Sequence, residues 1–417
     1  MNKLTKHVFS DLYTMSSGIS STKEQAGHGA PFLSFSAVFN NYFVPDELLD
    51  FMDASETQQE TYSIKKGDIF LTRTSEVIDE LAMSSVATKN YPRATYSGFL
   101  KRLRPTQNDV SYPKFMAFYL RGSLFRKTMT NNAVMTLRAS LNEDIFSYLD
   151  LLLPEFDEQV KIGDLLYAIN QKIDINDRAN RQLESMAKTL YDYWFIQFDF
   201  PNKDERPYKS DGGNMVYNEN LRREIPLGWN CIKLNSILDN KVKSVQAKNV
   251  PSCMPYTPID FIPMKKMSFA SSLSSKEAKT SLISYSENDI LIGAMRVYFH
   301  RVSIAPYDGI TRSTSMVLCP KNTSHLPFLY QVCNEERTIL VASKLSVGTQ
   351  QPYINWDDRL ENHLVPYPND EGLIEKYSKI VRPMQEKVIC NEKENESLRR
   401  LRDFLLPMLI NGQVTVK

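Results

Sequence analysis

The sequence predicts an α+β protein with two globular α/β domains in tandem, each followed by a long helix. The two helices are expected to pair as an antiparallel coiled coil with pseudo-twofold symmetry. Three observations support this fold class: a heptad pattern that occurs twice, a shorter turn-and-strand pattern ahead of each copy, and a polar break, "SDGGNMVYNEN" (210–220), at the midpoint of the 417 residues. A single core rarely keeps growing beyond about 250–300 residues, so a second domain is expected at this length.

The first domain is predicted to span residues 1–153. Within it, "IKKGDIFLTRTSE" (64–76) has a turn with an Asp, a short β-rich apolar run and an exposed basic residue, Arg73. The domain closes with an apolar run into a proline, "DLLLP" (150–154). Short apolar runs bounded by Gly, Pro and Asn are typical of strands and turns in a mixed α and β domain.

A central long helix is predicted over residues 154–198, because apolar residues recur there at helical spacing. In heptads its a positions are Ile162, Ile169, Asn176, Leu183 and Leu190. At about 40 residues the helix would be roughly 60 Å long, at 1.5 Å per residue.

A linker over residues 199–228 leads to a second domain over 229–366, and the earlier patterns return there. "YSENDILIGAMRV" (285–297) repeats the turn and strand and reaches a basic residue at Arg296, and "NHLVP" (362–366) repeats the closing run. The linker therefore joins one unit to the next copy of the same unit.

The C-terminal long helix is predicted over residues 367–417. Its a positions, 215 residues after the first set, are Tyr377, Met384, Asn391, Leu398 and Leu405. A buried Asn at an a position fixes the register of a coiled coil, and antiparallel pairing would bring Asn176 and Asn391 together near the middle. The pairs Leu183/Leu398 and Leu190/Leu405 share slots in the same way. Pro383, where the first helix has Ala168, is expected to kink the second helix or to mark the start of its regular part.

The composition is that of a soluble globular protein, with 42% hydrophobic and 24% charged residues. No apolar run approaches the roughly 18 residues that span a bilayer, and no secretory leader is recognisable, so a cytoplasmic protein is expected. Five dispersed cysteines without a CxxC pair argue against a disulfide framework and against a zinc site.

The net charge of +1 conceals a basic segment. From Leu81 to Asn142 there are ten basic residues and one acid, Asp109. Such a run is expected of a nucleic-acid-binding lobe on a neutral scaffold, and it is equally expected of chance clustering on a solvated surface.

Two stretches resemble a known family. "QLESMAKTLYDYWFIQFDFP", followed by "PYKSDGGNMVYNENLRREIPLGW", and the ending "LRRLRDFLLPMLINGQVTV" are similar to the specificity subunits of type I restriction–modification enzymes. "GTQQPYI" (348–354) also resembles a stretch near the end of a recognition domain in that family. The first half departs from the pattern, because it lacks an "IPxGW" lead-in and has "NNAVMTLRASL" where a GTQQPYI-like stretch would stand.

The resemblance implies two target-recognition domains that each read one half of a split, asymmetric DNA site, with the paired helices as a ruler between them. It implies double-stranded DNA, two methyltransferase subunits and two restriction/translocase subunits as partners. S-adenosylmethionine, ATP and Mg²⁺ would serve those partners, which perform adenine N6 methylation and cleavage. This chain would be non-catalytic and hold no cofactor.

Base edges are read by Arg, Lys, Gln and Asn side chains, and phosphates are held by Lys and Arg. The candidates for DNA contact in the first domain are Arg73, Thr74, Lys89, Arg93 and Arg138. Those in the second domain are Arg296, His300, Arg301, Thr349, Gln350 and Gln351.

Two other interpretations stay open from the residues alone. Asp260, followed by Glu277 and Lys279, has the order of a Mg²⁺-dependent endonuclease, in which carboxylates hold the metal and Lys steadies developing charge. A helical scaffold protein without a DNA role is the third possibility, and the basic run speaks against it.

Overall fold

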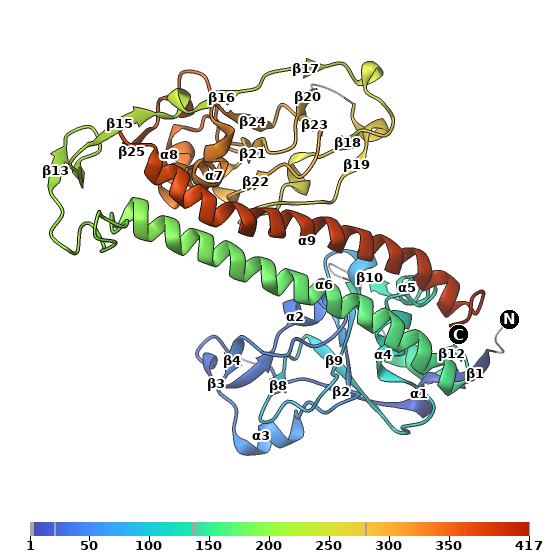
Figure 1. The fold of residues 1–417 in the computed structure, drawn as a ribbon. Coiled ribbons are helices and arrows are strands. Elements are labelled where there is room, and N and C mark those ends of the chain that lie inside the picture. The colour runs from blue at the N-terminus through green and yellow to red at the C-terminus, as the bar shows by residue number, and fades with distance from the viewer. Residues whose placement is uncertain (1–3, 21, 136–138, 142, 280–281, 417) are drawn as a thin grey trace. The chain divides into compact units, whose positions relative to one another are not determined.

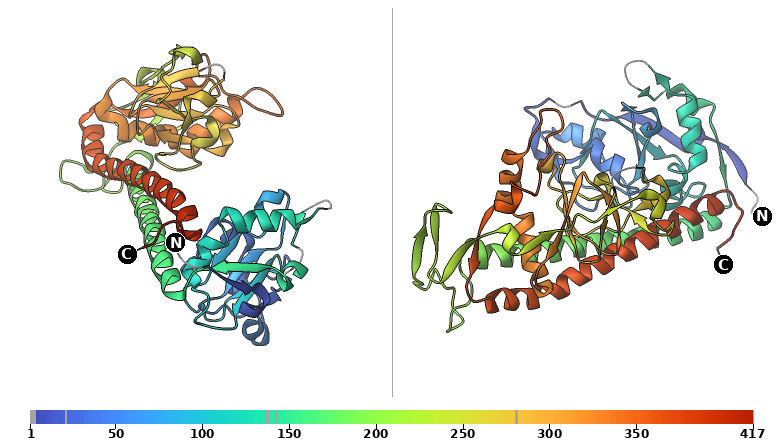
Figure 2. Two further views of the ribbon diagram at one scale, coloured as in Figure 1. Left: turned by 90° about the vertical axis from the view of Figure 1, so that its right-hand side faces the viewer. Right: turned by 90° about the horizontal axis from the view of Figure 1, so that it is seen from above.

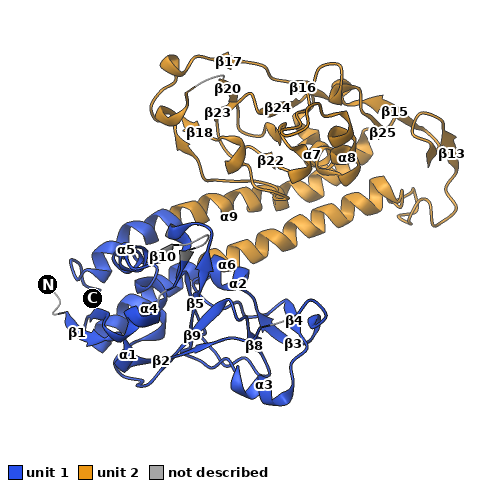
Figure 3. Cartoon of the chain, turned by 180° about the vertical axis from the view of Figure 1, so that it is seen from behind, with its two compact units in different colours: residues 1–171, 398–417 blue, residues 172–397 orange. Residues whose placement is uncertain are grey.

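The computed structural model describes residues 4–20, 22–135, 139–141, 143–279 and 282–416, which form two compact units (Figure 3). Unit 1 comprises residues 1–171 and 398–417, and unit 2 comprises residues 172–397. The long helices α6 (Phe156–Tyr191) and α9 (Gly372–Ile410) each contribute one part to each unit. The expected α+β class, with a globular domain ahead of each long helix, is confirmed.

Unit 1 contains short helices and strands that precede α6 in the chain (Figure 1). Its helices are α1 (Phe9–Leu12), α2 (Phe35–Asn40), α3 (Glu56–Thr61), α4 (Pro113–Tyr119) and α5 (Ser123–Asn131). Its strands are β1 (Thr5–Val8), β2 (Tyr13–Ser17), β3 (Ala26–Leu33), β4 (Asp50–Met52), β5 (Ile69–Thr72), β6 (Thr74–Ser75), β7 (Ser84–Val86), β8 (Thr95–Tyr96), β9 (Leu100–Pro105), β10 (Val134–Met135), β11 (Ala139–Ser140) and β12 (Asp150–Leu153).

Unit 2 contains the elements between the two long helices. Its helices are α7 (Leu326–Asn334) and α8 (Glu336–Leu345), with a one-turn 3₁₀ helix η8 (Val297–Phe299) that matters below. Its strands are β13 (Met215–Asn218), β14 (Arg223–Pro226), β15 (Trp229–Lys233), β16 (Leu238–Asn240), β17 (Ser244–Val245), β18 (Pro255–Tyr256), β19 (Leu273–Ser274), β20 (Leu282–Tyr285), β21 (Ile290–Gly293), β22 (Val302–Ile304), β23 (Gly309–Arg312), β24 (Ser315–Pro320) and β25 (Leu364–Pro368).

The two units are built on the same sheet topology. Unit 1 has an antiparallel sheet of order β2-β9-β5-β7, and unit 2 has one of order β16-β24-β21-β22. In each unit one further strand pair is parallel, β3 with β8 and β18 with β23. The first strand of each domain pairs with the strand that leads into the long helix, β1 with β12 and β15 with β25. The sequence repeat is therefore a repeat of this common core, to which unit 1 adds the sheet β10-β11-β6 and unit 2 adds β17 and β20 beside the parallel pair.

Each long helix is tied to its domain by its apolar stripe. In unit 1, Ile162 and Leu166 of α6 join Leu409 and Ile410 of α9 in the core that also contains β5 and α4. In unit 2, an aromatic cluster that includes Tyr191 at the end of α6 occupies the equivalent place. Burial of such side chains, at about 1.5–3 kcal/mol each, fixes the helix faces that the heptad pattern predicts.

Within unit 2 the two helices run antiparallel (Figure 2). They meet through buried asparagines. Asn176 donates to Asn395 Oδ1 at 2.9 Å, and Asn395 donates to Asp177 at 2.9 Å. The same series of hydrogen bonds occurs a second time with the roles of the two helices exchanged. Asn391 donates to Asn180 Oδ1 at 2.7 Å, and Asn180 donates to Glu392 at 3.1 Å. The expected contact between Asn176 and Asn391 is therefore wrong: each pairs with the other helix's second Asn, one turn further along.

The four leucines assigned to helix register are half-buried in both units, Leu183 and Leu190 in unit 2 and Leu398 and Leu405 in unit 1. The regular helix at the C-terminal end begins at Gly372, where the Asp370 carboxylate accepts the Gly372 N–H at 2.9 Å. It therefore starts eleven residues before Pro383, and Pro383 does not mark its start. Pro383 has no N–H to give to the carbonyl four residues earlier.

The linker has structure of its own. Asp199 accepts both the N–H and the hydroxyl of Ser210 at 2.7 Å, and β13 and β14 form an antiparallel hairpin. Gly213 lies so close to the Tyr208 ring that a Cβ there would come within 2.5 Å of it. The central Gly-Gly segment is thus a folded turn that carries the chain from α6 to the second domain.

Candidate nucleic-acid interface

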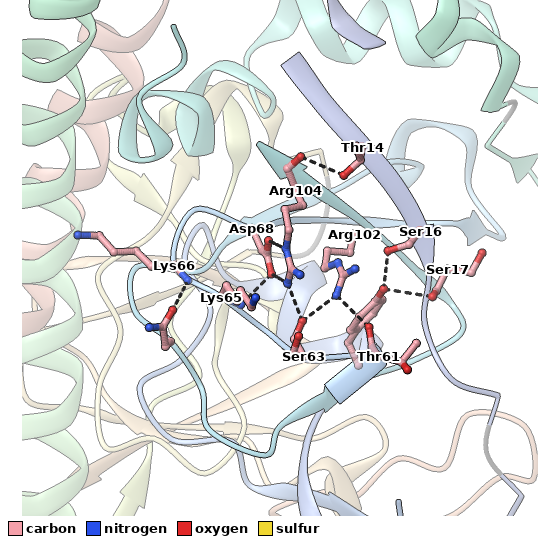
Figure 4. Close-up of polar contacts among 12 residues, drawn as sticks. Thr14, Ser16, Ser17, Thr61, Ser63, Lys65, Lys66, Asp68, Arg102 and Arg104 are labelled. Atoms are coloured by element: carbon pink, nitrogen blue, oxygen red, sulfur yellow. Dashed lines mark hydrogen bonds and ion pairs between the residues drawn. The ribbon is translucent and has the colours of Figure 1, made fainter. Parts of the chain in front are cut away.

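A buried ion pair closes the turn that precedes β5. Asp68 is fully buried, and its carboxylate accepts the Lys65 N–H at 2.8 Å and two N–H groups of Arg104 at 2.7 and 2.6 Å (Figure 4). Its hydrogen bonds to Arg104 hold the pKa of that guanidinium above its ordinary value. In unit 2 the matching Asp289 pairs with Lys241 at 3.2 Å. The Asp shared by the two sequence repeats is therefore structural.

The neighbouring cations of β9 are also occupied. Arg102 donates to the Ser63 carbonyl at 2.8 Å, and its guanidinium lies 5.3 Å from the centre of the Tyr96 ring (Figure 4). Burial lowers the pKa of Arg102 and raises that of Tyr96. Lys101 is only 4% exposed and forms an ion pair with Glu143.

Further along the basic run, Arg121 donates to four backbone carbonyls at 2.7 to 3.0 Å, and burial lowers its pKa to about 10. Arg126 donates to the Leu81 carbonyl, and Lys114 pairs with Asp164 at 2.7 Å. Most of the ten cations between Leu81 and Asn142 therefore hold unit 1 together, which overturns the interpretation of this run as an exposed DNA-binding face. The internally bonded residues are Lys101, Arg102, Arg104, Lys114, Arg121 and Arg126.

The unit 1 candidates Arg73 and Thr74 follow strand β5. The Arg73 backbone is fixed on both sides, since its N–H donates to the Phe99 carbonyl and its carbonyl accepts the Leu141 N–H, both at 2.9 Å, while its side chain is exposed. Thr74 lines a pocket of about 480 Å³. The other lining residues are Phe35, Phe39, Ser75, Glu76, Val77, Glu80 and Phe99.

The remaining unit 1 candidates are less closely grouped. Lys89 is exposed, with its Nζ 3.4 Å from an Asp46 oxygen. Arg93 is exposed, has a φ of +62°, and donates to Gln59 at 3.2 Å. Arg138 lies outside the described residues. The described part of unit 1 thus brings together only Arg73 and Thr74 of these candidates.

In unit 2, Arg296 is held at the start of η8 with guanidinium donors still available. Its φ of +51° is a left-handed conformation, and its N–H donates to the Pro352 carbonyl at 2.7 Å. One Nη donates weakly to the Gln350 carbonyl at 3.4 Å, and Nε is buried without a hydrogen-bond partner among the described residues. Because an unsatisfied buried donor costs about 1–3 kcal/mol, this guanidinium favours an added acceptor.

The loop of residues 347–353, named here the glutamine loop, lies beside Arg296. Val347 and Tyr353 exchange two backbone hydrogen bonds at 2.8 and 2.9 Å, which closes the loop at its base; an orange hairpin at this point of the chain projects from the domain in Figure 2. Thr349, Gln350 and Gln351 are all exposed at its tip. Glutamine amides can pair with the N6 and N7 groups of adenine.

Two candidates of unit 2 are structural supports instead. His300 is only 4% exposed, and its Nε2 lies 3.0 and 2.8 Å from the carbonyl and side-chain oxygens of Asn334. The prediction that His300 contacts DNA is therefore wrong, because its ring faces the domain interior. Arg301 donates to the Ile262 carbonyl and to the Asp260 carbonyl at 3.3 Å, so its guanidinium is occupied by the loop before it.

Backbone contacts show which positions of the two domains correspond. The Leu141 N–H donates to the Arg73 carbonyl in unit 1, as the Ile354 N–H donates to the Ala294 carbonyl in unit 2. Arg73 therefore corresponds to Ala294, and Arg296 corresponds to Ser75. The sequence comparison of Arg73 with Arg296 is thus two residues out of register, and the β10–β11 segment takes the place of the glutamine loop.

Sequence reasoning missed other residues around Arg296. The Thr314 hydroxyl is buried without a hydrogen-bond partner in the described structure, and the Thr314 carbonyl accepts the Ala294 N–H at 2.9 Å. Tyr298 and Phe299 are 50% and 40% exposed. The stretch "RVYFHR" contains both aromatic residues, but the sequence alone does not show whether an aromatic ring is exposed or lies in the core.

The endonuclease pattern does not assemble into a metal-binding group. Asp260 is exposed and lies 3.6 Å from Arg301. Across the described ranges, no group of three or more His, Cys, Asp or Glu side chains is placed to hold a metal ion. Among the described helices, none is long and apolar enough to cross a membrane.

Comparison with known proteins agrees with the two-domain arrangement. The chain is 27% identical over 369 residues to the MjaIX specificity subunit of Methanocaldococcus jannaschii, covering 84% of this chain and 78% of that one. It is 27% identical over 184 residues to the HindI specificity subunit of Haemophilus influenzae, covering 43% and 38% of the two chains. Its fold matches the crystal structure of a type I restriction–modification S subunit from M. genitalium, with a TM-score of 0.59, 17% identity, and 98% and 96% coverage.

The family comparison falls on the first domain and most of the first long helix. Residues 14–185 match the type I restriction modification DNA specificity domain. The chain is therefore similar in sequence to type I restriction enzyme specificity subunits, and similar in fold to a type I restriction–modification S subunit.

Proposed function

We propose that this chain is the DNA-recognition subunit of a type I restriction–modification complex and that it binds a bipartite, asymmetric site. The observation that carries the proposal is in unit 2, where the half-buried guanidinium of Arg296, held on the protein by one weak hydrogen bond from Nη, lies next to the exposed amides of the glutamine loop. Arg pairs with the O6 and N7 acceptors of guanine, and Gln pairs with adenine. Unit 2 would therefore read purine edges in the major groove.

The difference between the two domains supports an asymmetric site. At the positions that correspond in the backbone, unit 1 has Ser75 where unit 2 has Arg296, and it has an aromatic-lined pocket beside Thr74. Two domains with the same scaffold and different side chains at these positions would select different base sequences. Each would then define one half of the recognised site.

We propose that the chain itself is non-catalytic, which its likeness to chains named specificity subunits supports. We propose that it assembles in the cytoplasm with two methyltransferase subunits and two restriction/translocase subunits. S-adenosylmethionine, ATP and Mg²⁺ would be bound by those partners and not by this chain. Exposed apolar residues on the long helices, such as Met186, Ile380 and Phe404, are candidates for contact with them.

The test is co-expression of the full chain with its methyltransferase, followed by mapping of methylated adenines in host DNA. A split site with two unlike halves is expected. Arg296→Ala should weaken binding to a duplex with that site by about 1–3 kcal/mol and relax one half only. Arg206→Ala is the matched control, because Arg206 is exposed in the linker and pairs with Asp211 at 3.6 Å. Unchanged methylation at both halves in the Arg296→Ala complex would show that Arg296 reads no base.

A gel-shift series separates the other interpretations. Salt-sensitive retardation of duplex DNA without cutting, in the presence of Mg²⁺, is expected of the recognition subunit. Cutting by the chain alone would favour the endonuclease, with Asp260, Glu277 and Lys279 as the residues to change. A complex that fails to retard DNA even in low salt would favour a scaffold without a DNA role.

A further inference from the structure

The turn of residues 296–300, named here the η8 turn, is held in an unusual backbone conformation. Arg296 and His300 stand at its two ends with φ of 51° and 53°, and both are left-handed although neither is glycine. A left-handed conformation is strained for a residue other than glycine, because its Cβ lies too close to the backbone. Such strain persists only where the surroundings determine the conformation.

The surroundings fix the η8 turn at both ends. At its first end the Arg296 N–H is bound to the Pro352 carbonyl. At its last end the His300 carbonyl accepts the Lys265 N–H at 2.9 Å, and the His300 ring contacts Asn334. The buried His300, which the sequence suggested as a DNA contact, is therefore a positioning residue for this turn.

The side chains between these anchors have opposite environments. Val297 is 2% exposed and packs into the core. Tyr298 and Phe299 face outward with half or nearly half of their surface exposed, and their rings pack edge to face, with centroids 5.0 Å apart. The strained turn thus holds two large aromatic rings at the surface in one place.

Cations at both ends of the turn indicate what covers these rings. Arg296 lies at one end, and the exposed Lys265 and Lys266 lie beside His300 at the other. Two acids in the same neighbourhood lie beside cations: Glu336 is paired with Lys265 at 3.0 Å, and Asp260 lies 3.6 Å from Arg301, whose guanidinium is 5.9 Å from the centre of the Phe299 ring. Apolar rings flanked by cations complement duplex DNA, in which the thymine C5-methyl group offers an apolar contact between two rows of phosphate.

We propose that Tyr298 and Phe299 are specificity-determining residues that pack on thymine methyl groups in the major groove, next to the base contacted by Arg296. The proposal rests on the proposed function and names a readout that Arg296 and the glutamine loop do not supply. Hydrogen-bonding side chains distinguish bases by the donors and acceptors on their edges, whereas the two rings would distinguish thymine by its C5-methyl group.

The test uses the full chain with its methyltransferase and a duplex with the mapped site. Each thymine of the unit 2 half-site is replaced in turn by deoxyuridine, which removes only the methyl group. At one or two positions the unaltered complex should bind about fourfold more weakly, since one buried carbon is worth about 0.8 kcal/mol. Tyr298→Ala and Phe299→Ala complexes should bind the thymine duplex on the order of tenfold more weakly and show no further loss with deoxyuridine.

Two measurements separate this outcome from others. The slope of log affinity against log salt should stay unchanged in both variants, because a ring that contacts a base releases no counterions. Tyr217→Ala is the matched control, since Tyr217 is a 61% exposed ring on β13 of the same unit, and it should bind as the unaltered complex does.

Several results would overturn the proposal. If both variants bind the thymine duplex as tightly as the unaltered complex, the proposed role of the two rings is overturned. The proposed recognition function is not affected by that result, provided that the unaltered complex methylates a split site. A persisting deoxyuridine penalty in the variants, a shallower salt slope, or loss of the co-purified methyltransferase would each assign the rings a different role. Failure of the unaltered complex to methylate any split site would instead contradict the proposed function itself.

Discussion

Replacement of Asn180 by Leu tests the buried asparagine layer of the helix pair. Asn180 is 4% exposed, accepts from Asn391 at 2.7 Å and donates to Glu392 at 3.1 Å. Leu has the same number of side-chain heavy atoms in the same branched arrangement but neither polar group, so the substitution removes both hydrogen bonds without opening a cavity. Its effect therefore reports the polar interactions and not the packing.

The expected cost follows from the two hydrogen bonds that the substitution removes. Each contributes about 1 kcal/mol, and the Asn391 amide, only 1% exposed, is left without its acceptor at a further cost of about 1–3 kcal/mol. Burial of the new methyl groups offsets part of this, which leaves roughly 3 kcal/mol. Asn180→Leu combined with Asn391→Leu removes both partners and should recover about 2 kcal/mol of that loss, because replacing both members of a buried polar pair by apolar groups is nearly neutral.

Hydrogen exchange is the appropriate assay, because a chain with two compact units need not unfold in one step. Peptides covering residues 172–191 and 380–397 report the local stability of the pair. A loss of 1 kcal/mol speeds exchange about fivefold, so Asn180→Leu should speed it by roughly two orders of magnitude. Gln182→Leu, at an exposed position of the same helix, is the control.

Two results would refute the reasoning. Exchange in Asn180→Leu within about twofold of the unaltered chain would mean that the layer contributes nothing measurable. A double variant that exchanges as fast as the single one would mean that Asn180 and Asn391 do not act as a pair.

Other predictions follow from single interactions. Burial lowers the pKa of His363 to about 4, so the unfolded chain gains a proton at His363 below pH 6.5 and the folded chain does not until about pH 4. The free energy of unfolding should therefore fall as the pH is lowered through that window, by about 2 kcal/mol at pH 5. In a plot of melting temperature against pH, His363→Leu should show a smaller decrease on the acid side. Asp68→Ala should cost about 3 kcal/mol, because it leaves Arg104 half-buried without its carboxylate, whereas the melting temperature of Asp109→Ala, at an exposed site, should not change. Gly163→Ala should lower the melting temperature of unit 1, since its Cβ would lie 2.7 Å from the Phe115 nitrogen.

The long helices were predictable because their signal is repeated. Burial of one stripe imposes the same spacing on turn after turn, and the second copy of the pattern confirmed the first. The partner of each Asn was not predictable in the same way. Asn180 and Asn395 share a slot as well as Asn176 and Asn391, so two registers one turn apart satisfy the sequence, and the choice depends on packing along the whole pair.

The candidates for DNA contact were harder to assess from the sequence, because charge in a sequence does not reveal burial. Arg121 and Arg102 belong to the most basic stretch of the chain, yet their guanidinium groups bind backbone carbonyls of unit 1. Arg296 stands in a less basic stretch and has a buried Nε without a partner in the described structure. The useful signal was the turn-and-strand repeat that leads to it, and even this placed Arg73 two positions away from its true counterpart.

Under the proposed function, the shared backbone would allow the two domains of one chain to recognise different sequences without different folds. In each unit the segment after the buried strand, β5 or β21, accepts a backbone hydrogen bond from a later loop. The backbone positions of the residues that follow are therefore fixed independently of their side chains. The residue type can therefore differ between Ser75 and Arg296, because neither side chain takes part in that backbone hydrogen bond. Under the proposed function, specificity would therefore change by substitution at these positions and in the later loop that bonds to this segment, while the sheet, the buried Asp and the long helices stay the same.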